Sequence, residues 1–386
     1  MSSLCTGCGA ELLEDAAFCI KCGQAVPTTI AAPPLTIPHV VSMEERAKRV
    51  DLVFEGGGVK GIGLLGACSV LEERGFHFHH LAGTSAGAIV ATLLAAGYTT
   101  AELQAIMAEL DFRQFMDRGD DSYIPFLGTT FNVLRDEGLY EGERFLQWMS
   151  DLLLAKGVRT FGDLTHPDST EQELRYHYRL QVIASDLTQR CLLILPRDAH
   201  SLGVEPDMLN VALAVRMSMS IPVFFEPVRF RNPETGREHI IVDGGILSNF
   251  PVWLFDCGDD EPEHATFGLR LIEPDPAASL ADRIPDFDTL DGVMGIVHYL
   301  RILVETMTAA HDRMYLAAAD FARTIGIPTL GIRTTEFGLS KERSQALFEA
   351  GRAAAETFLK DWSFENYLEQ YRRRRLAAAG REPVEP

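Results

Sequence analysis

The chain has 386 residues, of which 46% are hydrophobic and 23% are charged. This composition supplies a large apolar core and excludes a chain that is disordered throughout. The 35 lysines and arginines are outnumbered by 55 aspartates and glutamates, for a net charge of −20, which argues against broad nucleic-acid binding and against simple electrostatic adsorption to anionic lipid.

The N-terminus and the longest uncharged stretch of the sequence predict a cytoplasmic protein. The first basic residue is Lys21, so the N-terminus lacks the basic region of a signal peptide. The longest uncharged stretch is Leu81–Ala101, and it is interrupted by LAGTSAG and AGYTTA. Its helical part, about Ala86–Ala96, would span roughly 16 Å, about half of a bilayer core. We therefore expect a soluble protein in the cytoplasm, with at most peripheral contact at a membrane.

The N-terminal segment 1–26 contains four cysteines in two CxxC pairs, Cys5 with Cys8 and Cys19 with Cys22. Four thiolates satisfy tetrahedral Zn²⁺, and a CxxC turn presents two sulfurs to one ion. Because 26 residues cannot build a core alone, metal binding would supply the free energy of folding. The pattern predicts a structural Zn²⁺ site; redox-active CxxC pairs are the alternative.

The same segment, CTGCGAELLEDAAFCIKCG, resembles the short zinc-ribbon family. Zinc ribbons bind proteins or nucleic acids. This segment has three acidic residues, Glu11, Glu14 and Asp15, and one basic residue, Lys21. This charge favours a protein partner or a purely structural role over nucleic acid.

Residues 27–47 form a proline-containing linker, and from about residue 48 strands alternate with helices, which predicts an α/β fold. The predicted strands are Val50–Phe54, Phe76–Ala82, Arg179–Ser185, Cys191–Leu195, Glu238–Val242, Ala265–Leu271 and Leu330–Arg333. The predicted helices are 61–74, 86–96, 141–155, 291–318 and 341–359. A further helix is predicted to start at a capping box of Thr99 and Glu102 and to run to residue 110.

Two further segments allow a functional and a structural interpretation. Asp117–Gly138 is polar with several apolar side chains, which fits a lid or a plain surface loop. In the tail 361–386, aromatic residues such as Trp362 and Phe364 precede Arg372–Arg375. They could seat a helix at a lipid interface, but packing of the aromatic face on the domain is favoured.

Gly83-x-Ser85-x-Gly87 follows a predicted strand and precedes a predicted helix. In this nucleophile-elbow pattern a sharp turn makes the serine project, and the flanking glycines let backbones pass closely. The helix N-terminus favours developing negative charge beside the serine. The pattern therefore predicts a nucleophilic serine.

The glycine run Gly56-Gly57-Gly58 offers backbone N–H groups that could stabilise an oxyanion. Together with Gly61 it also matches the dinucleotide fingerprint, which needs an acidic residue at the end of the second strand. That strand reads FHFHHLAG and carries none. A P-loop is excluded because Lys60 is followed by glycine instead of serine or threonine.

Asp243 is the favoured base for Ser85. It ends a predicted strand, and Gly244 and Gly245 allow close approach. A carboxylate is a weaker base than imidazole, so its pocket must raise its pKa. A Ser…Asp…His triad is the alternative and would use a histidine that follows Asp243. Three are available: His264, His298 and His311.

The motifs GGGVKG, GTSAG and DGG, in this order, resemble the patatin-like phospholipase family. The resemblance continues through MSMSIP, DGGILSNFP and LGIRTTEFGLS and covers about residues 49–360. It implies a three-layer sandwich with a central, mostly parallel sheet and a Ser–Asp dyad in place of a triad. The zinc ribbon and the last 25 or so residues lie outside it.

Carried onto this sequence, the resemblance implies Ser85 as nucleophile and Asp243 as general base. The Gly57, Gly58 and Ala86 N–H groups would stabilise the oxyanion. Lys60 stands where the family carries a basic residue, often arginine. The residues that support the motifs are Gly56, Lys60, Gly61, Gly83, Gly87, Gly244 and Gly245.

We therefore expect a zinc ribbon (1–26), a linker (27–47), a patatin-like catalytic domain (48–360) and a helical, basic tail (361–386). The expected activity is a phospholipase A-type hydrolysis of fatty-acyl esters in membrane phospholipids or related glycerolipids, through an acyl-enzyme and without a catalytic metal or cofactor. One alternative is a regulated protein that binds a partner through the ribbon and keeps a latent hydrolase, for example a triggered membrane-degrading effector. Another is a hydrolase of soluble esters.

Overall fold

The computed structural model describes residues 42–110, 112–115, 142–166, 174–222, 224–256, 261–273, 318–334 and 336–378. The chain divides into two units, Met1–Ser42 and Met43–Pro386, and the description below concerns the second. The predicted zinc ribbon, the segment 117–138 and the helix over 291–318, apart from its last residue, lie outside the described residues.

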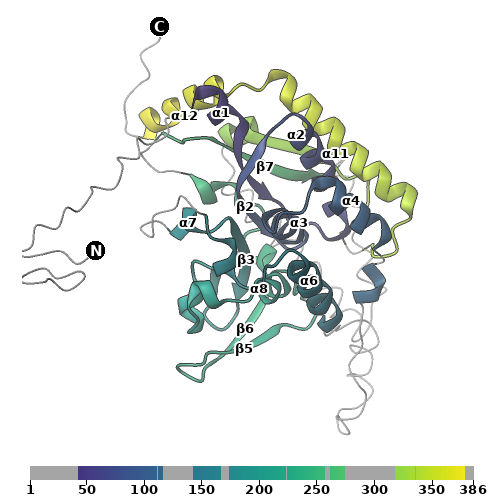
Figure 1. Cartoon of the computed structure of the whole chain (residues 1–386), viewed down its shortest axis with the longest axis vertical. Helices are drawn as coiled ribbons and strands as arrows, with labels where there is room; N and C mark the ends of the chain where they lie inside the picture. The colour runs from purple at the N-terminus through teal and green to yellow at the C-terminus, as the bar shows by residue number, and fades with distance from the viewer. Residues whose placement is uncertain are drawn as a thin grey trace, which may run out of the picture. The chain divides into compact units, whose positions relative to one another are not determined.

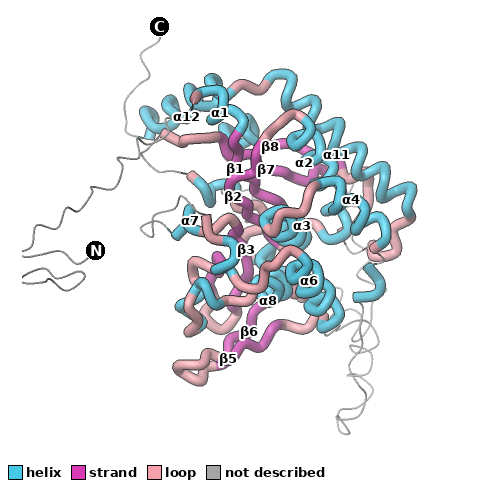
Figure 2. The backbone as a smooth tube through the Cα atoms, viewed as in Figure 1, coloured by secondary structure: helices cyan, strands magenta, loops and turns pink. Residues whose placement is uncertain are grey.

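Eight strands form one sheet in the described part of the chain, and Figure 1 and Figure 2 show helices packed around it. The strands are β1 (Arg49–Phe54), β2 (His77–Thr84), β3 (Leu180–Asp186), β4 (Cys191–Leu195), β5 (Val228–Arg231), β6 (Glu238–Asp243), β7 (Ala265–Ile272) and β8 (Thr324–Pro328). Their order is β5-β6-β3-β2-β1-β7-β8, and β4 pairs with β3. This sheet confirms the predicted α/β fold.

The centre of the sheet is parallel and one side is antiparallel. β1 runs parallel to β2 and β7, β2 to β3, and β7 to β8. β6 runs antiparallel to both β3 and β5. All seven residues of β3 and five of six in β1 are buried, as expected for strands that are covered on both faces by helices.

The α-helices are α1 (Met43–Lys48), α2 (Gly61–Glu73), α3 (Ala86–Ala95), α4 (Thr100–Glu109), α6 (Glu143–Ala155), α7 (Leu174–His177), α8 (Val211–Ser218), α11 (Lys341–Asp361) and α12 (Phe364–Ala378). The short 3-10 helices are η1 (Gly58–Lys60), η2 (Phe112–Phe115), η3 (Phe161–Leu164), η4 (Ala199–Leu202), η5 (Pro206–Met208), η6 (Gly244–Ile246), η7 (Val252–Phe255) and η9 (Ala318–Arg323).

Helix boundaries follow from local chemistry. The Thr99 side chain accepts the Glu102 N–H and the Glu102 carboxylate accepts the Thr99 N–H, so the predicted capping box begins α4. α2 and α11 lie side by side (Figure 1). A Cβ on Gly351 would come within 1.9 Å of the Gly63 carbonyl oxygen, so these two helices pack backbone against backbone.

The strand predicted over Leu330–Arg333 is wrong. Leu330 and Gly331 have φ angles of 54° and 69°, and the Ile332 N–H donates to the Thr329 carbonyl at 3.0 Å, which makes this segment a turn. The strand is the preceding segment, β8, which pairs with β7. Its glycine and terminal proline resemble breakers in the sequence but are tolerated at a sheet edge.

The tail aromatics pack on the domain, as the favoured interpretation predicted. The Trp362 ring lies 5.7 Å from the ring of Phe76 and 5.0 Å from that of Phe267, and Phe364 is buried. The side chains of Arg372–Arg375 lie outside the description. Judged by length and hydropathy, none of the helices in the described ranges could traverse a bilayer.

Candidate active site

Ser85 forms the turn between β2 and α3, and its backbone has a conformation that residues other than glycine rarely adopt. Its φ and ψ are 53° and −125°, and its side chain is largely buried. A Cβ on Gly83 would lie 2.4 Å from backbone atoms of Gly87, and a Cβ on Gly87 would lie 2.5 Å from the Phe54 carbonyl oxygen. The two motif glycines are therefore needed for close approach of the backbone, and the serine occupies a strained elbow.

The register of β3 brings Asp243 to the level of Ser85. Thr84, at the end of β2, pairs with Ile183 of β3, and the next residue, Ala184, pairs with Asp243 at the end of β6. Ser85 and Asp243 thus flank one position of β3 from opposite sides. Neighbouring strands lie about 4.8 Å apart, so their backbones are separated by about 10 Å, a gap that two inward-directed side chains can bridge.

The Asp243 carboxyl has one oxygen engaged and one without a partner. Its Oδ1 accepts the Gly245 N–H at 2.7 Å, whereas its buried Oδ2 has no hydrogen-bond partner within the described residues. Burial raises the pKa of Asp243 from 3.8 to about 6, and the nearby Ser85 hydroxyl and the Gly245 N–H offset part of that increase. The group is therefore a carboxylate near neutral pH, with an oxygen available to accept a proton.

The glycine loop after β1 exposes amide groups. Gly58 has φ of 56°, and a Cβ there would lie 2.0 Å from the Thr334 carbonyl oxygen, so no larger residue fits. Its neighbour Val59 donates its N–H to that same oxygen at 3.2 Å. In the described part of the chain, the N–H groups of Gly57 and Gly58 have no backbone acceptor. The Ala86 N–H belongs to the first turn of α3, where no helical acceptor exists.

The last turn of α8 and the residues that follow it connect the serine turn to the aspartate. The Ser85 N–H donates to Ser218 Oγ at 2.9 Å, and the Asp243 N–H donates to the Ser220 carbonyl at 2.9 Å. The Arg216 guanidinium donates to Ser220 Oγ at 2.5 Å, and all three of these α8-segment side chains are buried. The segment MSMSIP was one of the motifs of the family resemblance. Its hydrogen bonds to Ser85 and Asp243 are tertiary contacts that sequence reasoning missed.

Asn249 links the glycine loop to the loop that follows Asp243. The Gly56 N–H donates to the Asn249 backbone carbonyl, and the Asn249 side-chain amide donates to the Gly56 carbonyl, both at 3.1 Å. The Thr84 hydroxyl donates to the Ser248 carbonyl at 3.1 Å. In the sequence, Asn249 stood out only as part of the segment DGGILSNFP, and that segment did not indicate a role for its side-chain amide.

Lys60 is buried and pairs with a partly buried acid. Its ammonium lies 2.9 Å from Glu273 Oε1, and Glu273 Oε2 accepts the Thr329 hydroxyl at 2.8 Å. This pair fixes the glycine loop to the ends of β7 and β8. The remaining motif glycines, Gly61, Gly244 and Gly245, lie in tight contacts, with Cβ positions 3.3 Å from Ala86 Cβ, 2.3 Å from the Ile183 carbonyl and 2.9 Å from Asn249 Oδ1 respectively.

A predominantly apolar pocket opens at Ser85. The empty space within it is about 510 Å³, part of which is open solvent. Its lining comprises Gly58, Val59, Ser85, Ala86, Ile89, Met107, Leu110, Phe115, Phe145, Trp148, Met219, Ile221, Phe225 and Phe337. Such a lining suits an alkyl chain because it offers dispersion and apolar burial without competing polar groups.

His264 does not complete a triad with Ser85. It directly precedes β7, and its Nε2 lies 2.9 Å from Asp51 Oδ1 at the amino-terminal half of β1. Ser85 lies beyond the carboxyl end of the neighbouring parallel strand β2. His298 and His311 fall outside the described residues.

The sheet and the turn at Ser85 define an α/β protein with a serine at a strand-to-helix elbow, and comparison with known sequences gives the family. The patatin-like phospholipase family matches residues 52–256, and the zinc-ribbon domain family matches residues 4–26. The chain belongs to the patatin-like phospholipase family and carries an N-terminal zinc-ribbon domain, as the resemblances indicated.

The chain is also similar to individual proteins. Uncharacterized protein YqhO of Bacillus subtilis is 39% identical over 319 residues, which cover 82% of this chain and 99% of YqhO. Probable lipid hydrolase 463L of Invertebrate iridescent virus 6 is 26% identical over 215 residues, which cover 56% of this chain and 66% of that protein. The crystal structure of VipD from Legionella pneumophila has the same fold, with a TM-score of 0.50 and 18% identity over 81% of this chain and 67% of VipD.

Proposed function

We propose that this protein is a serine lipid acyl hydrolase of the phospholipase A type, with Ser85 as nucleophile and Asp243 as general base. The observation that carries the proposal is a strained elbow serine that lines an apolar pocket. On the other side of β3, at the same level, lies the buried Asp243, whose Oδ2 has no hydrogen-bond partner among the described residues. The family and the probable lipid hydrolase among its relatives support the same class of substrate.

In the first half of the reaction, Ser85 Oγ attacks the ester carbonyl carbon while Asp243 Oδ2 accepts the hydroxyl proton. The carbonyl oxygen becomes an oxyanion and accepts hydrogen bonds from the Gly57, Gly58 and Ala86 N–H groups. Collapse of the tetrahedral intermediate breaks the ester bond. The leaving lysolipid alkoxide takes the proton from Asp243, and the acyl group remains on Ser85.

In the second half, Asp243 accepts a proton from water, whose oxygen attacks the acyl-Ser85 carbonyl. The same N–H groups stabilise the second oxyanion. When this intermediate collapses, Ser85 Oγ leaves and regains the proton from Asp243, and the fatty acid is released. These steps need no metal or redox cofactor, because the serine, the carboxylate and the amides supply each role.

The substrate is a phospholipid or related glycerolipid at a membrane surface. The apolar lining beside Ser85 would hold one acyl chain, and the polar headgroup would stay in water. The protein would act in the cytoplasm and contact the membrane transiently.

The ribbon has a separate proposed role. Cys5, Cys8, Cys19 and Cys22 form a four-thiolate set that suits structural Zn²⁺, and the domain would dock a protein partner that controls the hydrolase. A variant that lacks residues 1–26 should keep its basal activity if this domain is regulatory.

Release of free fatty acid from mixed phospholipid vesicles tests the enzymatic proposal. The wild-type chain should release fatty acid, and Ser85→Ala and Asp243→Asn should each reduce release at least 1,000-fold, in line with losses at other nucleophile–base pairs. His200→Ala, on an exposed histidine, is the matched control and should retain full activity. Full activity in Asp243→Asn would refute the dyad, and hydrolysis confined to soluble esters would refute the lipid substrate.

A further inference from the structure

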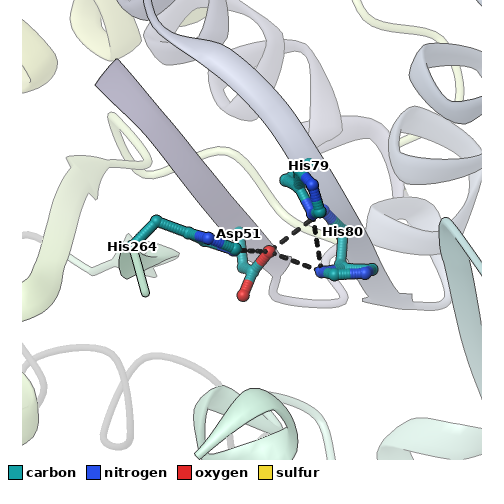
Figure 3. Close-up of side chains that lie close together, drawn as sticks. All are labelled: Asp51, His79, His80 and His264. Carbon is teal, nitrogen blue, oxygen red and sulfur yellow. Dashed lines mark hydrogen bonds and ion pairs between the residues drawn. The ribbon is translucent and has the colours of Figure 1, made fainter. Parts of the chain in front are cut away.

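Four side chains capable of binding a metal converge at the half of the sheet that lies away from Ser85. They are Asp51 of β1, His79 and His80 of β2, and His264, which precedes β7 (Figure 3). One ligand atom from each lies within 4.8 Å of the others. Asp51 Oδ1 lies 2.9 Å from His80 Nδ1 and 2.9 Å from His264 Nε2, and the two Nδ1 atoms of His79 and His80 are 3.2 Å apart.

An irregularity in strand pairing creates this cluster. Val50 pairs with Phe78, but Leu52 pairs with Leu81, so Asp51 alone faces both His79 and His80. Consecutive residues of a regular strand point to opposite faces of the sheet. The extra residue in β2 allows both imidazoles to approach Asp51. Such bulges are rare between parallel strands and commonly re-aim side chains for a specific purpose.

The hydrogen bonding of His80 directs a lone pair into the cluster. Its Nε2 lies 3.2 Å from the Tyr176 backbone carbonyl, which can only accept, so Nε2 carries a proton. In the neutral imidazole, Nδ1 is then an acceptor. It faces the carboxylate Asp51 Oδ1, which already accepts the His80 backbone N–H at 3.0 Å. The two electron pairs therefore point at one another unless a metal ion, or a second proton on the imidazole, lies between them.

We propose that Asp51, His79, His80 and His264 bind a divalent transition-metal ion, with Zn²⁺ the best match. Three imidazole nitrogens and one carboxylate oxygen form a four-ligand set typical of Zn²⁺ and unsuited to Mg²⁺ or Ca²⁺. A tetrahedron with bonds of about 2.0–2.1 Å has edges of about 3.3–3.4 Å. The ligand pairs at 2.9, 2.9 and 3.2 Å need to separate by only a few tenths of an ångström.

The surroundings support a metal site with a structural role. The Tyr176 carbonyl acts as the outer partner that fixes a ligand histidine in its binding tautomer. The Asp51 and His80 side chains are about 95% buried, whereas His79 and His264 are partly exposed and leave a route for the ion. His80 and Ser85 are five residues apart on an extended strand, about 16 Å, so the ion would join β1, β2 and the start of β7 without touching the ester.

Cobalt binding to the full-length chain tests this site apart from the zinc ribbon. In a variant with Cys5, Cys8, Cys19 and Cys22 all changed to serine, the metal-free protein should bind one Co²⁺ per chain. Its spectrum should show d–d bands without a thiolate-to-cobalt charge-transfer band, because no ligand is sulfur. Zn²⁺ should displace the Co²⁺ and raise the thermal midpoint.

Substitutions within the cluster should abolish this binding. His79→Ala combined with His264→Ala, in the same background with the four ribbon cysteines changed to serine, should reduce Co²⁺ binding at least 100-fold. His77→Ala, on an exposed histidine of the same strand, should leave it unchanged. If the double variant does not fold, the four-serine protein decides alone. A folded four-serine protein that binds no Co²⁺, or a folded double variant that binds it as well as the parent, would overturn the proposal.

Discussion

The raised pKa of Asp243 makes this residue a source of instability at neutral and alkaline pH. Burial lifts its pKa from 3.8 to about 6, so the fold favours the neutral carboxyl. The stabilising contribution of the neutral group is fully present below pH 3.8 and is lost as pH rises through about 6. A difference of about 2 pKa units corresponds to about 3 kcal/mol, which is the cost of holding the carboxylate ionised at pH 8.

Asp243→Asn removes this cost because an amide does not ionise. The amide oxygen can still accept the Gly245 N–H. We expect the variant to be inactive yet more stable than wild type at pH 8, by up to about 3 kcal/mol. For a unit of this size, an unfolding entropy of about 2 cal/mol/K per residue converts that difference into a rise of about 4 °C in thermal midpoint.

Thermal unfolding at pH 8 and at pH 4 measures the effect. The stability gain should be present at pH 8 and should shrink toward zero at pH 4, where the wild-type carboxyl is also largely neutral. Glu234→Gln, on an exposed turn residue, is the control and should change neither midpoint. An Asp243→Asn variant that gains nothing at pH 8, or gains equally at both pH values, would refute the argument from burial.

Three further substitutions test other parts of the site. Gly58→Ala should lower kcat/KM at least 100-fold in a fatty-acid release assay, because the new Cβ would collide with the Thr334 carbonyl and displace an oxyanion donor. Ser218→Ala removes the acceptor for the Ser85 N–H and should lower kcat about 10-fold, the effect of one hydrogen bond, with little change in KM. Ile89→Trp should fill the pocket and shift the preference in a series of p-nitrophenyl esters toward shorter acyl chains, with activity on the acetyl ester retained.

The sequence specified the strand–turn–helix units around the site but not how they meet. The turns at Gly83–Gly87 and Gly56–Gly58 were predictable because glycine at fixed spacing reports close backbone approach. The position of Asp243 depends on its pairing with Ala184. Register of this kind is set by long-range pairing, which a single sequence does not reveal. The family resemblance supplied only the expectation that Asp243 acts with Ser85.

The parts that sequence reasoning missed depend on tertiary contacts. Ser218 is an ordinary serine at the end of a helix until its hydroxyl meets the Ser85 N–H. The histidines of FHFHHLAG read only as part of a strand, because Asp51 and His264 are distant in sequence and the bulge in β2 has no glycine or proline to mark it. Burial and register create both features.

Active-site labelling with a fluorophosphonate tests the central claim most directly, because the probe reacts only with an activated serine. Peptide mapping should find one adduct, on Ser85. Its rate of formation should rise with pH, pass its midpoint at about pH 6, where Asp243 is half ionised, and level off above about pH 7. Asp243→Asn should slow labelling at least 1,000-fold while the protein stays folded. An adduct on a different serine, or labelling of Ser85 at the wild-type rate in Asp243→Asn, would contradict the account.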